Sequence, residues 1–177
     1  MYFDELKRAM EWLAKKPDTI FLGQAVAAPG TAMSNTLVDI PAERLLEFPV
    51  AEEMQMGQSI GLAFDGYVSV SIFPRWNFLL LAMNQLVNHL DKMPEITSDR
   101  IRPRVIIRTS VGSERPLFPQ HQHIGDYSDA LKLMLDHVHV VRLEEADQIL
   151  PEYQKAYDRD DGRSTILVEY GDYYNEK

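Results

Sequence analysis

The sequence predicts one α/β domain, in which a mostly parallel sheet is covered by helices on both faces to give three layers. Segments with helical spacing of apolar residues alternate along the chain with short apolar segments rich in Val and Ile. This alternation is typical of a parallel sheet buried on both faces. The 177 residues suffice for one core, and no repeat, low-complexity tract or linker divides them. We therefore expect a single domain over residues 1–177.

Each element is predicted from local spacing and composition. Apolar residues at helical spacing predict helices over residues 3–16, 48–66, 77–92, 128–135 and 144–157. Short apolar runs predict strands over residues 19–23, 67–73, 105–110, 138–143 and 164–170. Residues 24–35 and 115–126 are predicted to be loops. We expect Pro151 to interrupt or kink its helix, because proline lacks the amide hydrogen that a helix interior needs.

Composition excludes several classes of function. The formal charge is −9, from 27 acidic and 18 basic residues, which argues against nucleic acid as the main partner. The chain has no cysteine, so disulfides, thiolate catalysis and cysteine zinc sites are excluded. No apolar run is long enough to span a bilayer, and the amphipathic, acidic N-terminus is unlike a signal peptide. We expect a soluble cytoplasmic protein that does not act on a membrane.

The segment FPVAEEMQMGQSIGLAFDG, from Phe48 to Gly66, places two glutamates at the start of a largely apolar helix. The positive end of a helix dipole favours one acidic residue in the first turn, and Glu53 meets that need. Glu52 is then the candidate for chemistry. Gly57 and Gly61 lie one helical turn apart and favour close packing of this helix against another helix or a ligand.

His121 and His123 lie in a polar loop and could indicate a metal site, or be two exposed loop histidines. The chain lacks cysteine and the HExxH spacing, so we predict no metal ligands in it. It also lacks a nucleotide-binding glycine loop and a serine nucleophile elbow. The residues alone thus indicate a soluble α/β domain and do not name a function.

The order of the motifs is more informative. YFDELKRAMEWLAKKPDTIFLGQAV, FPVAEEMQMGQSIGLAFDG, WNFLLLAMNQLVNHLDKM, RPRVIIRTSVGS and PQHQ follow one another at characteristic separations. Together they resemble the pyrimidine-binding domain of thiamine-diphosphate enzymes, most closely the N-terminal half of the beta subunit of 2-oxo-acid dehydrogenases, and more distantly transketolase. The resemblance covers nearly the whole chain and implies the thiamine-diphosphate-binding fold.

The resemblance also implies a site. The family's Pro-x-x-Glu falls on Pro49 and Glu52, and that glutamate bonds the ring nitrogen of the aminopyrimidine. A desolvated carboxyl that shares a proton with this nitrogen promotes the reactive imino tautomer. Phe78 matches the aromatic residue that packs on the pyrimidine ring, and His121 matches the histidine that faces the substrate. The resemblance therefore implies that Glu52 and His121 are catalytic and that Glu52 and Phe78 bind thiamine diphosphate.

Some family features are absent from the sequence. The family's Gly-Glu-Asp is Gly23-Gln24-Ala25 here, and the aspartate of its Asp-Gln pair is Asn84. There is no Gly-Asp-Gly motif, with which the family holds diphosphate and Mg²⁺ in a second domain. We expect that the diphosphate-binding and C-terminal transketolase domains are absent and that a diphosphate-binding, alpha-like partner subunit holds the Mg²⁺. The resemblance implies a two-fold hetero-oligomer that is active only with that partner.

The leading hypothesis is a subunit of a split thiamine-diphosphate enzyme that cleaves or transfers a carbon–carbon bond next to the carbonyl of a small substrate. The second is a non-catalytic assembly or regulatory subunit that keeps the fold, motivated by Gln24-Ala25 and the missing domains. The third is an ordinary α/β ligand-binding domain, if the resemblance is accidental.

Overall fold

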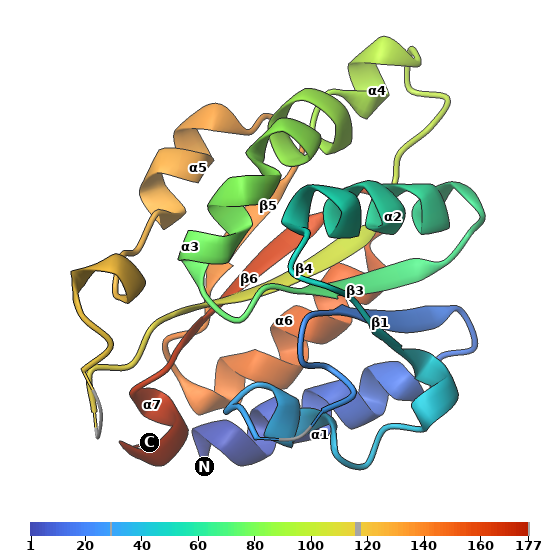
Figure 1. The fold of residues 1–177 in the computed structure, drawn as a ribbon. Helices are drawn as coiled ribbons and strands as arrows, with labels where there is room; N and C mark the ends of the chain where they lie inside the picture. The colour runs from blue at the N-terminus through green and yellow to red at the C-terminus, as the bar shows by residue number, and fades with distance from the viewer. Residues whose placement is uncertain (29, 116–117, 177) are drawn as a thin grey trace.

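The computed structural model describes residues 1–28, 30–115 and 118–176 and contains one sheet of six parallel strands (Figure 1). The strands are β1 (Thr19–Gly23), β2 (Leu45–Glu47), β3 (Val68–Ile72), β4 (Val105–Val111), β5 (His139–Arg142) and β6 (Thr165–Tyr170). Their order across the sheet is β2-β1-β3-β4-β6-β5. The predicted parallel sheet is confirmed, and every pair of neighbouring strands is parallel.

Helices cover both faces of this sheet (Figure 1). They are α1 (Tyr2–Ala14), α2 (Glu52–Phe64), α3 (Trp76–Leu79), α4 (Met93–Ile96), α5 (Ser128–Met134), α6 (Ala146–Asp158) and α7 (Tyr173–Glu176). One core cluster joins the sheet to α1 and α6, and the other joins it to α2, α3 and α5. The N-terminus lies beside α7, where the rings of Tyr2 and Tyr173 meet with centroids 5.6 Å apart. The predicted three layers are confirmed.

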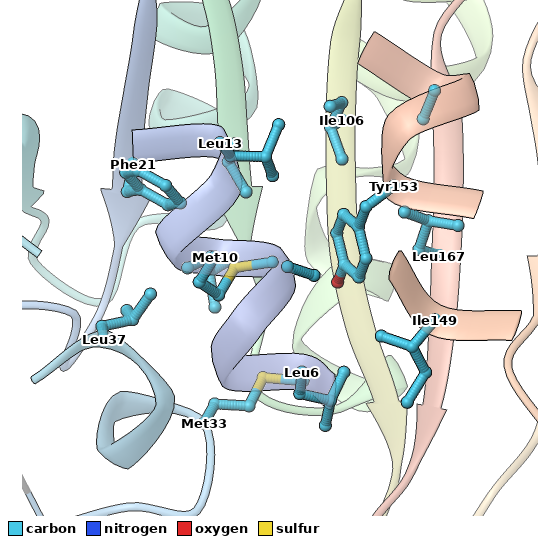
Figure 2. Packing of buried hydrophobic residues seen from close by; sticks show 14 of the residues in the cluster. Leu6, Met10, Leu13, Phe21, Met33, Leu37, Ile106, Ile149, Tyr153 and Leu167 are labelled. Atoms are coloured by element: carbon cyan, nitrogen blue, oxygen red, sulfur yellow. The ribbon is translucent and has the colours of Figure 1, made fainter. Parts of the chain in front are cut away.

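The core under α1 and α6 is apolar and tightly packed (Figure 2). Leu6 and Met10 of α1 belong to the same cluster as Tyr153 of α6 and Ile106 of β4. Burial of a side chain of this size contributes about 1.5–3 kcal/mol to stability. The alternation of side chains along each strand sends neighbours such as Val105 and Ile107 into the other core cluster. Both faces of the sheet are therefore buried, as the apolar strands predicted.

The contact between α2 and β3 includes buried polar side chains. Gln55 Nε2 donates a hydrogen bond to Ser71 Oγ at 3.1 Å, and Ser69 Oγ donates to the carbonyl oxygen of Ser59 at 3.1 Å. Gln55 Nε2 also donates to the carbonyl oxygen of Ile72 at 2.9 Å. These bonds satisfy buried polar groups and fix the start of α2 beside the carboxyl end of β3.

Residues 76–90 are helical without a break, which confirms the helix predicted over residues 77–92, but the segment is not a uniform α-helix. The chain forms α3, then a 3-10 turn over Leu80–Ala82 and a π-helical segment over Gln85–Leu90. These turns differ in residues per turn, so a face drawn at 3.6 residues per turn loses its register. Of the apolar residues at helical spacing in this segment, Leu86 and Leu90 are buried, whereas Leu81 is 58% exposed.

Three further differences from the sequence-based prediction concern two short elements and the helix that contains Pro151. β2 was not predicted, because three residues give too little pattern, and α7 was missed for the same reason. α6 runs through Pro151 without interruption. Pro151 is exposed, so the carbonyl group that loses its amide partner can bond to water.

In the described part of the chain, no helix has the length and apolar character needed to cross a bilayer.

Candidate functional site

The carboxyl ends of four adjacent strands, β1, β3, β4 and β6, converge on one cleft with a volume of about 370 Å³. In an open parallel sheet this edge is where ligands bind, because the loops that follow the strands meet there. The described residues that line it are Gln24, Ala25, Thr31, Ala32, Met33, Pro74, Arg75, Phe78, Ser110, Gly112, Ser113, His123, Gly171 and Tyr174. They come from segments far apart in the sequence.

Glu52 is the first residue of α2, and its side chain is only 7% exposed. Within the described residues it makes no hydrogen bond or ion pair. Glu53, its neighbour, is exposed. Gln55, one turn further on, bonds to the ends of β1 and β3, so Glu52 lies at the carboxyl edge of the sheet. The two glutamates thus differ in burial, and Glu52 does not line the cleft itself.

Phe78 lines the cleft and is half-buried. Its ring faces that of His123, with centroids 6.0 Å apart and planes inclined by 32°. His121 is exposed, and its ring lies edge-on against Phe118 with centroids 5.6 Å apart. The structure therefore brings Phe78 together with His123, and it leaves His121 outside the cleft on the same short turn, His121–His123.

A close approach of two loops fixes this arrangement. A Cβ atom at Gly112 would lie 1.9 Å from the carbonyl oxygen of His123 and 3.5 Å from Cδ of Arg75. Only glycine leaves room for the His121–His123 turn to lie against the end of β4. On the other side, Ser110 Oγ donates to the carbonyl oxygen of Pro74 at 2.7 Å and ties β4 to the turn before α3.

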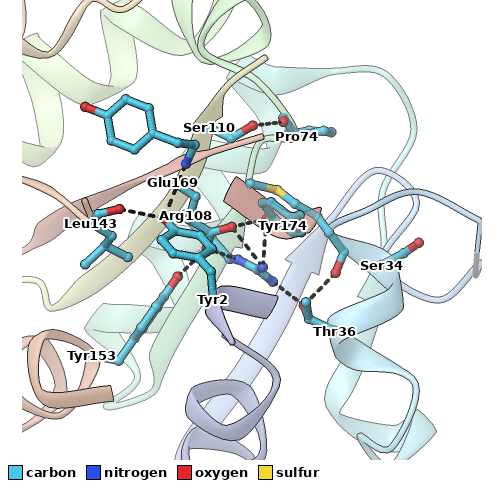
Figure 3. A network of polar contacts seen from close by, with 12 residues as sticks. Tyr2, Ser34, Thr36, Pro74, Arg108, Ser110, Leu143, Tyr153, Glu169 and Tyr174 are labelled. Carbon is cyan, nitrogen blue, oxygen red and sulfur yellow. Dashed lines mark hydrogen bonds and ion pairs between the residues drawn. The ribbon is translucent and has the colours of Figure 1, made fainter. Parts of the chain in front are cut away.

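A buried polar network lies beneath the cleft (Figure 3). Arg108 of β4 donates from Nη2 to Glu169 of β6 at 3.0 Å and from Nη1 to Thr36 Oγ1 at 2.8 Å. Tyr153 donates to Glu169 at 2.9 Å, and the Tyr174 hydroxyl also donates to Glu169. Tyr174 lines the cleft, so the network supports its floor.

The charges in this network compensate each other. Burial alone lowers the pKa of Arg108, but the negative charge of Glu169 raises that pKa above the usual range. Burial and then the charge of Glu169 raise the pKa of Tyr174 well above its ordinary value. Arg108 therefore stays charged and Tyr174 stays protonated as a donor, so the floor of the cleft carries no net charge.

Sequence reasoning missed several residues of this edge. Arg75 and Tyr174 were not predicted as site residues, and His123 was considered only as a loop histidine or a metal ligand. A signal existed for Arg108 and Glu169, since a charged residue within an apolar strand needs a buried partner. No local signal could show that Tyr174 returns to the end of β4.

No family model matches the chain. The pyruvate dehydrogenase E1 component subunit beta of Gracilaria tenuistipitata var. liui is 28% identical over 137 residues, which cover 74% of this chain and 42% of that protein. The mitochondrial subunit beta of Caenorhabditis elegans is 28% identical over 122 residues, 67% of this chain and 35% of that protein.

Solved structures share the fold. A split gene transketolase in an inactive beta4 tetramer superposes with a TM-score of 0.72 and 16% identity, covering 94% of this chain and 50% of that one. Transketolase from Leishmania mexicana gives a TM-score of 0.69 and 15% identity, covering 94% and 24%. The chain is a distant homologue of the E1 beta subunit. The predicted resemblance and the expected transketolase-like fold are confirmed.

The chain spans about two fifths of the length of the curated relatives it matches. Its Gly23-Gln24-Ala25 segment, which lacks the expected acidic residues, lies at the rim of the cleft. Glu47 of β2 reaches this loop instead and accepts hydrogen bonds from the backbone N–H groups of Ala25 at 2.6 Å and Ala27 at 2.8 Å. A carboxylate is therefore present beside the loop, where it binds the backbone.

Proposed function

We propose that this chain binds the aminopyrimidine end of thiamine diphosphate through Glu52 and Phe78, as the beta-like subunit of a split enzyme. The observation that carries the proposal is Glu52, a residue that is only 7% exposed and whose carboxyl makes no hydrogen bond or ion pair with a described residue. Such a group is costly unless a ligand or another chain completes it. Distant homology to E1 beta subunits supports thiamine diphosphate as that ligand.

The residues present fit the group. The aminopyrimidine needs a carboxyl shielded from water at one ring nitrogen, and Glu52 meets this requirement at the carboxyl edge of the sheet. Phe78 offers a half-exposed aromatic surface for a planar ring to stack on. Gln55, bonded to the ends of the strands, holds the first turn of α2 in place, so Glu52 is positioned before any ligand arrives.

Bound thiamine diphosphate supplies the electron sink for cleaving or transferring a carbon–carbon bond next to a carbonyl. Glu52 holds a proton at the ring nitrogen, and Phe78 orients the ring. His121, on an exposed turn, moves a proton to or from the small carbonyl substrate once a second domain closes over it. The reaction is of the 2-oxo-acid dehydrogenase or transketolase type.

The diphosphate and Mg²⁺ need other residues, since the 177 residues contain no Gly-Asp-Gly motif. We propose that a diphosphate-binding, alpha-like subunit supplies them in a two-fold hetero-oligomer. Supporting this, the outer side of α2 is open: Met54 and Phe64 are exposed, and a Cβ atom at Gly57 or Gly61 would meet nothing within 4 Å. An acidic, cysteine-free chain also supports a location in the cytoplasm.

The test compares two neighbouring glutamates in the complex that co-purifies with the tagged chain. Thiamine-diphosphate-dependent turnover is expected to fall by about 100-fold or more in Glu52→Gln, because general acid–base contributions are of that size. The matched control, Glu53→Gln, is expected to retain wild-type turnover, since Glu53 is exposed. Undiminished turnover in Glu52→Gln would overturn the proposed role.

The second candidate is a non-catalytic assembly or regulatory subunit. His121 outside the cleft and Gln24-Ala25 at its rim favour it, and a split gene transketolase of the same fold forms an inactive beta4 tetramer. Calorimetric titration of the purified complex with thiamine diphosphate and Mg²⁺ separates the two. Saturable binding supports the catalytic role, and absence of binding in the assembled complex supports the assembly role.

A further inference from the structure

The cleft at the carboxyl ends of β1, β3, β4 and β6 has an unusual charge distribution for this protein. The chain has 27 acidic residues and 18 basic ones, yet none of the described residues that line the cleft is Asp or Glu. One arginine, one histidine and several hydroxyl groups line it instead. In an acidic protein, such a lining marks a place where negative charge is accepted.

Arg75 is the charged residue of this lining, and it has no partner. No described residue forms a hydrogen bond or an ion pair with its guanidinium. Two other arginines of the chain are, by contrast, paired with carboxylates, Arg108 with Glu169 and Arg142 with Asp129. A half-buried guanidinium presents up to five N–H donors in a planar fork, and these donors are free in the cleft.

His123 lies beside it with a second unmet polar group. Its Nδ1 is buried and has no hydrogen-bond partner among the residues that the structure describes. The backbone carbonyl group of His123 and Cδ of Arg75 both approach Gly112, and both residues line the cleft. Stacking against Phe78 holds the imidazole ring in place. Buried polar atoms are rarely left unpaired, so this pair of residues calls for a ligand.

The acidic groups nearest the cleft are already engaged. Glu169 is paired with Arg108 below the floor. Asp172 accepts hydrogen bonds from the backbone N–H groups of Glu114 at 2.9 Å and Arg115 at 3.0 Å. Glu47 is bonded to the backbone of Ala25 and Ala27. The positive charge of Arg75 is therefore not neutralised within the cleft.

We propose that this cleft is an oxyanion-binding site in which Arg75 and His123 together hold the carboxylate or phosphate group of a small ligand. A guanidinium matches two oxygens of either group in a bidentate pair. Glu52 does not line the cleft, whereas Phe78, the other residue of the proposed thiamine-diphosphate site, lines it beside His123. Anion binding does not depend on thiamine diphosphate. If the proposed function also holds, the oxyanion group is the charged end of the carbonyl substrate.

The test titrates the full chain, without thiamine diphosphate, with inorganic phosphate and separately with acetate, by calorimetry at constant ionic strength. Wild type is expected to bind at least one of the two saturably in the millimolar range. Arg75→Gln is expected to weaken that binding by about tenfold or more, the size of a charge-assisted hydrogen bond, and Arg75→Lys by less. The preferred anion tells whether the site suits phosphate or carboxylate.

Arg163→Gln is the matched control, because it removes the same charge just before β6, at the opposite edge of the sheet. Its affinity for the anion is expected to equal that of wild type. Absence of saturable binding to wild type, or equal binding by Arg75→Gln, would overturn the site. Should Arg75→Gln fail to fold, the ¹⁵N resonances of the His123 ring in wild type test whether the anion binds at this site. A shift on adding the anion that tracks saturation supports the site, and no shift overturns it.

Discussion

The side chains of Arg108 and Glu169 form an ion pair that is completely buried, across the neighbouring strands β4 and β6. Nε and Nη2 of the guanidinium donate to separate carboxylate oxygens, at 2.5 and 3.0 Å. Tyr153 and Tyr174 add hydrogen bonds to the same carboxylate (Figure 3). This pair links the centre of the sheet to the floor of the cleft, so its loss affects both stability and the site.

The first prediction concerns this pair. Glu169→Gln leaves the Arg108 charge buried without a counter-charge, so the free energy of unfolding is expected to fall by about 3–5 kcal/mol. Urea denaturation followed by circular dichroism measures it. Tyr153→Phe, which removes one hydrogen bond to Glu169, is the milder comparison and is expected to cost about 1 kcal/mol. Wild-type stability of Glu169→Gln would contradict the importance of the pair.

The second prediction concerns acid stability and Asp91. This carboxylate is buried and accepts backbone N–H bonds from His137 at 2.7 Å, Val138 at 3.0 Å and Asp136 at 3.1 Å. Burial by itself raises the pKa of Asp91, but these bonds and Lys92 outweigh it and lower the pKa below the usual value. Because the folded-state pKa is the lower one, the stability from Asp91 is fully present above the unfolded pKa, about 3.9.

That contribution is lost as pH falls through the lowered pKa of Asp91 in the folded state. Asp91→Asn replaces one accepting carboxylate oxygen by an NH₂ group that cannot accept a hydrogen bond from a backbone N–H. At neutral pH the free energy of unfolding is therefore expected to fall by about 1–3 kcal/mol. The difference between variant and wild type should shrink below about pH 4. Thermal melts across this pH range measure it. A difference that does not depend on pH would show that the charge of Asp91 is not what stabilises the turn before β5.

The third prediction concerns Gly112. Gly112→Ala places a methyl group 1.9 Å from the carbonyl oxygen of His123, so the His121–His123 turn must move. We expect a loss of about 1–3 kcal/mol, typical of overpacking, together with changed resonances for the His123 ring. Chemical denaturation and NMR measure the two effects. Unchanged His123 resonances would contradict the close approach that holds His123 in the cleft.

The fourth prediction concerns the outer face of α2. Gly57→Ala and Gly61→Ala are each expected to stabilise the isolated chain by roughly 0.5–1 kcal/mol, because alanine is the better helix former and nothing lies within 4 Å. If this face packs against another subunit, as proposed, the same methyl groups should weaken assembly. Melting temperature and sedimentation velocity separate the effects. Higher stability with unchanged assembly would exclude these glycines from the interface.

Much of the fold was predictable because its signals are local. Helical spacing in α1 and apolar runs in β4 and β6 depend on neighbours in the sequence, and both sets of elements were predicted within a few residues. The helix after β3 was predicted too, but its 3-10 and π-helical turns were not, because they reflect packing and not spacing. The expected interruption at Pro151 was wrong for the same reason, because Pro151 lies on the exposed side of α6, where the helix tolerates it.

The candidate site divides in the same way. Glu52 and Phe78 were predicted as site residues from an ordered set of motifs. The sequence by itself determined the parallel sheet, the helix start at Glu52 and the family resemblance, since these depend on spacing along the chain. Tertiary structure alone decided that Glu52 is buried while Glu53 is exposed, and that His123, not His121, lies with Arg75 and Phe78 in the cleft. The physical reason is that parallel strands bring their carboxyl ends to one edge, where loops distant in sequence meet and compete for space.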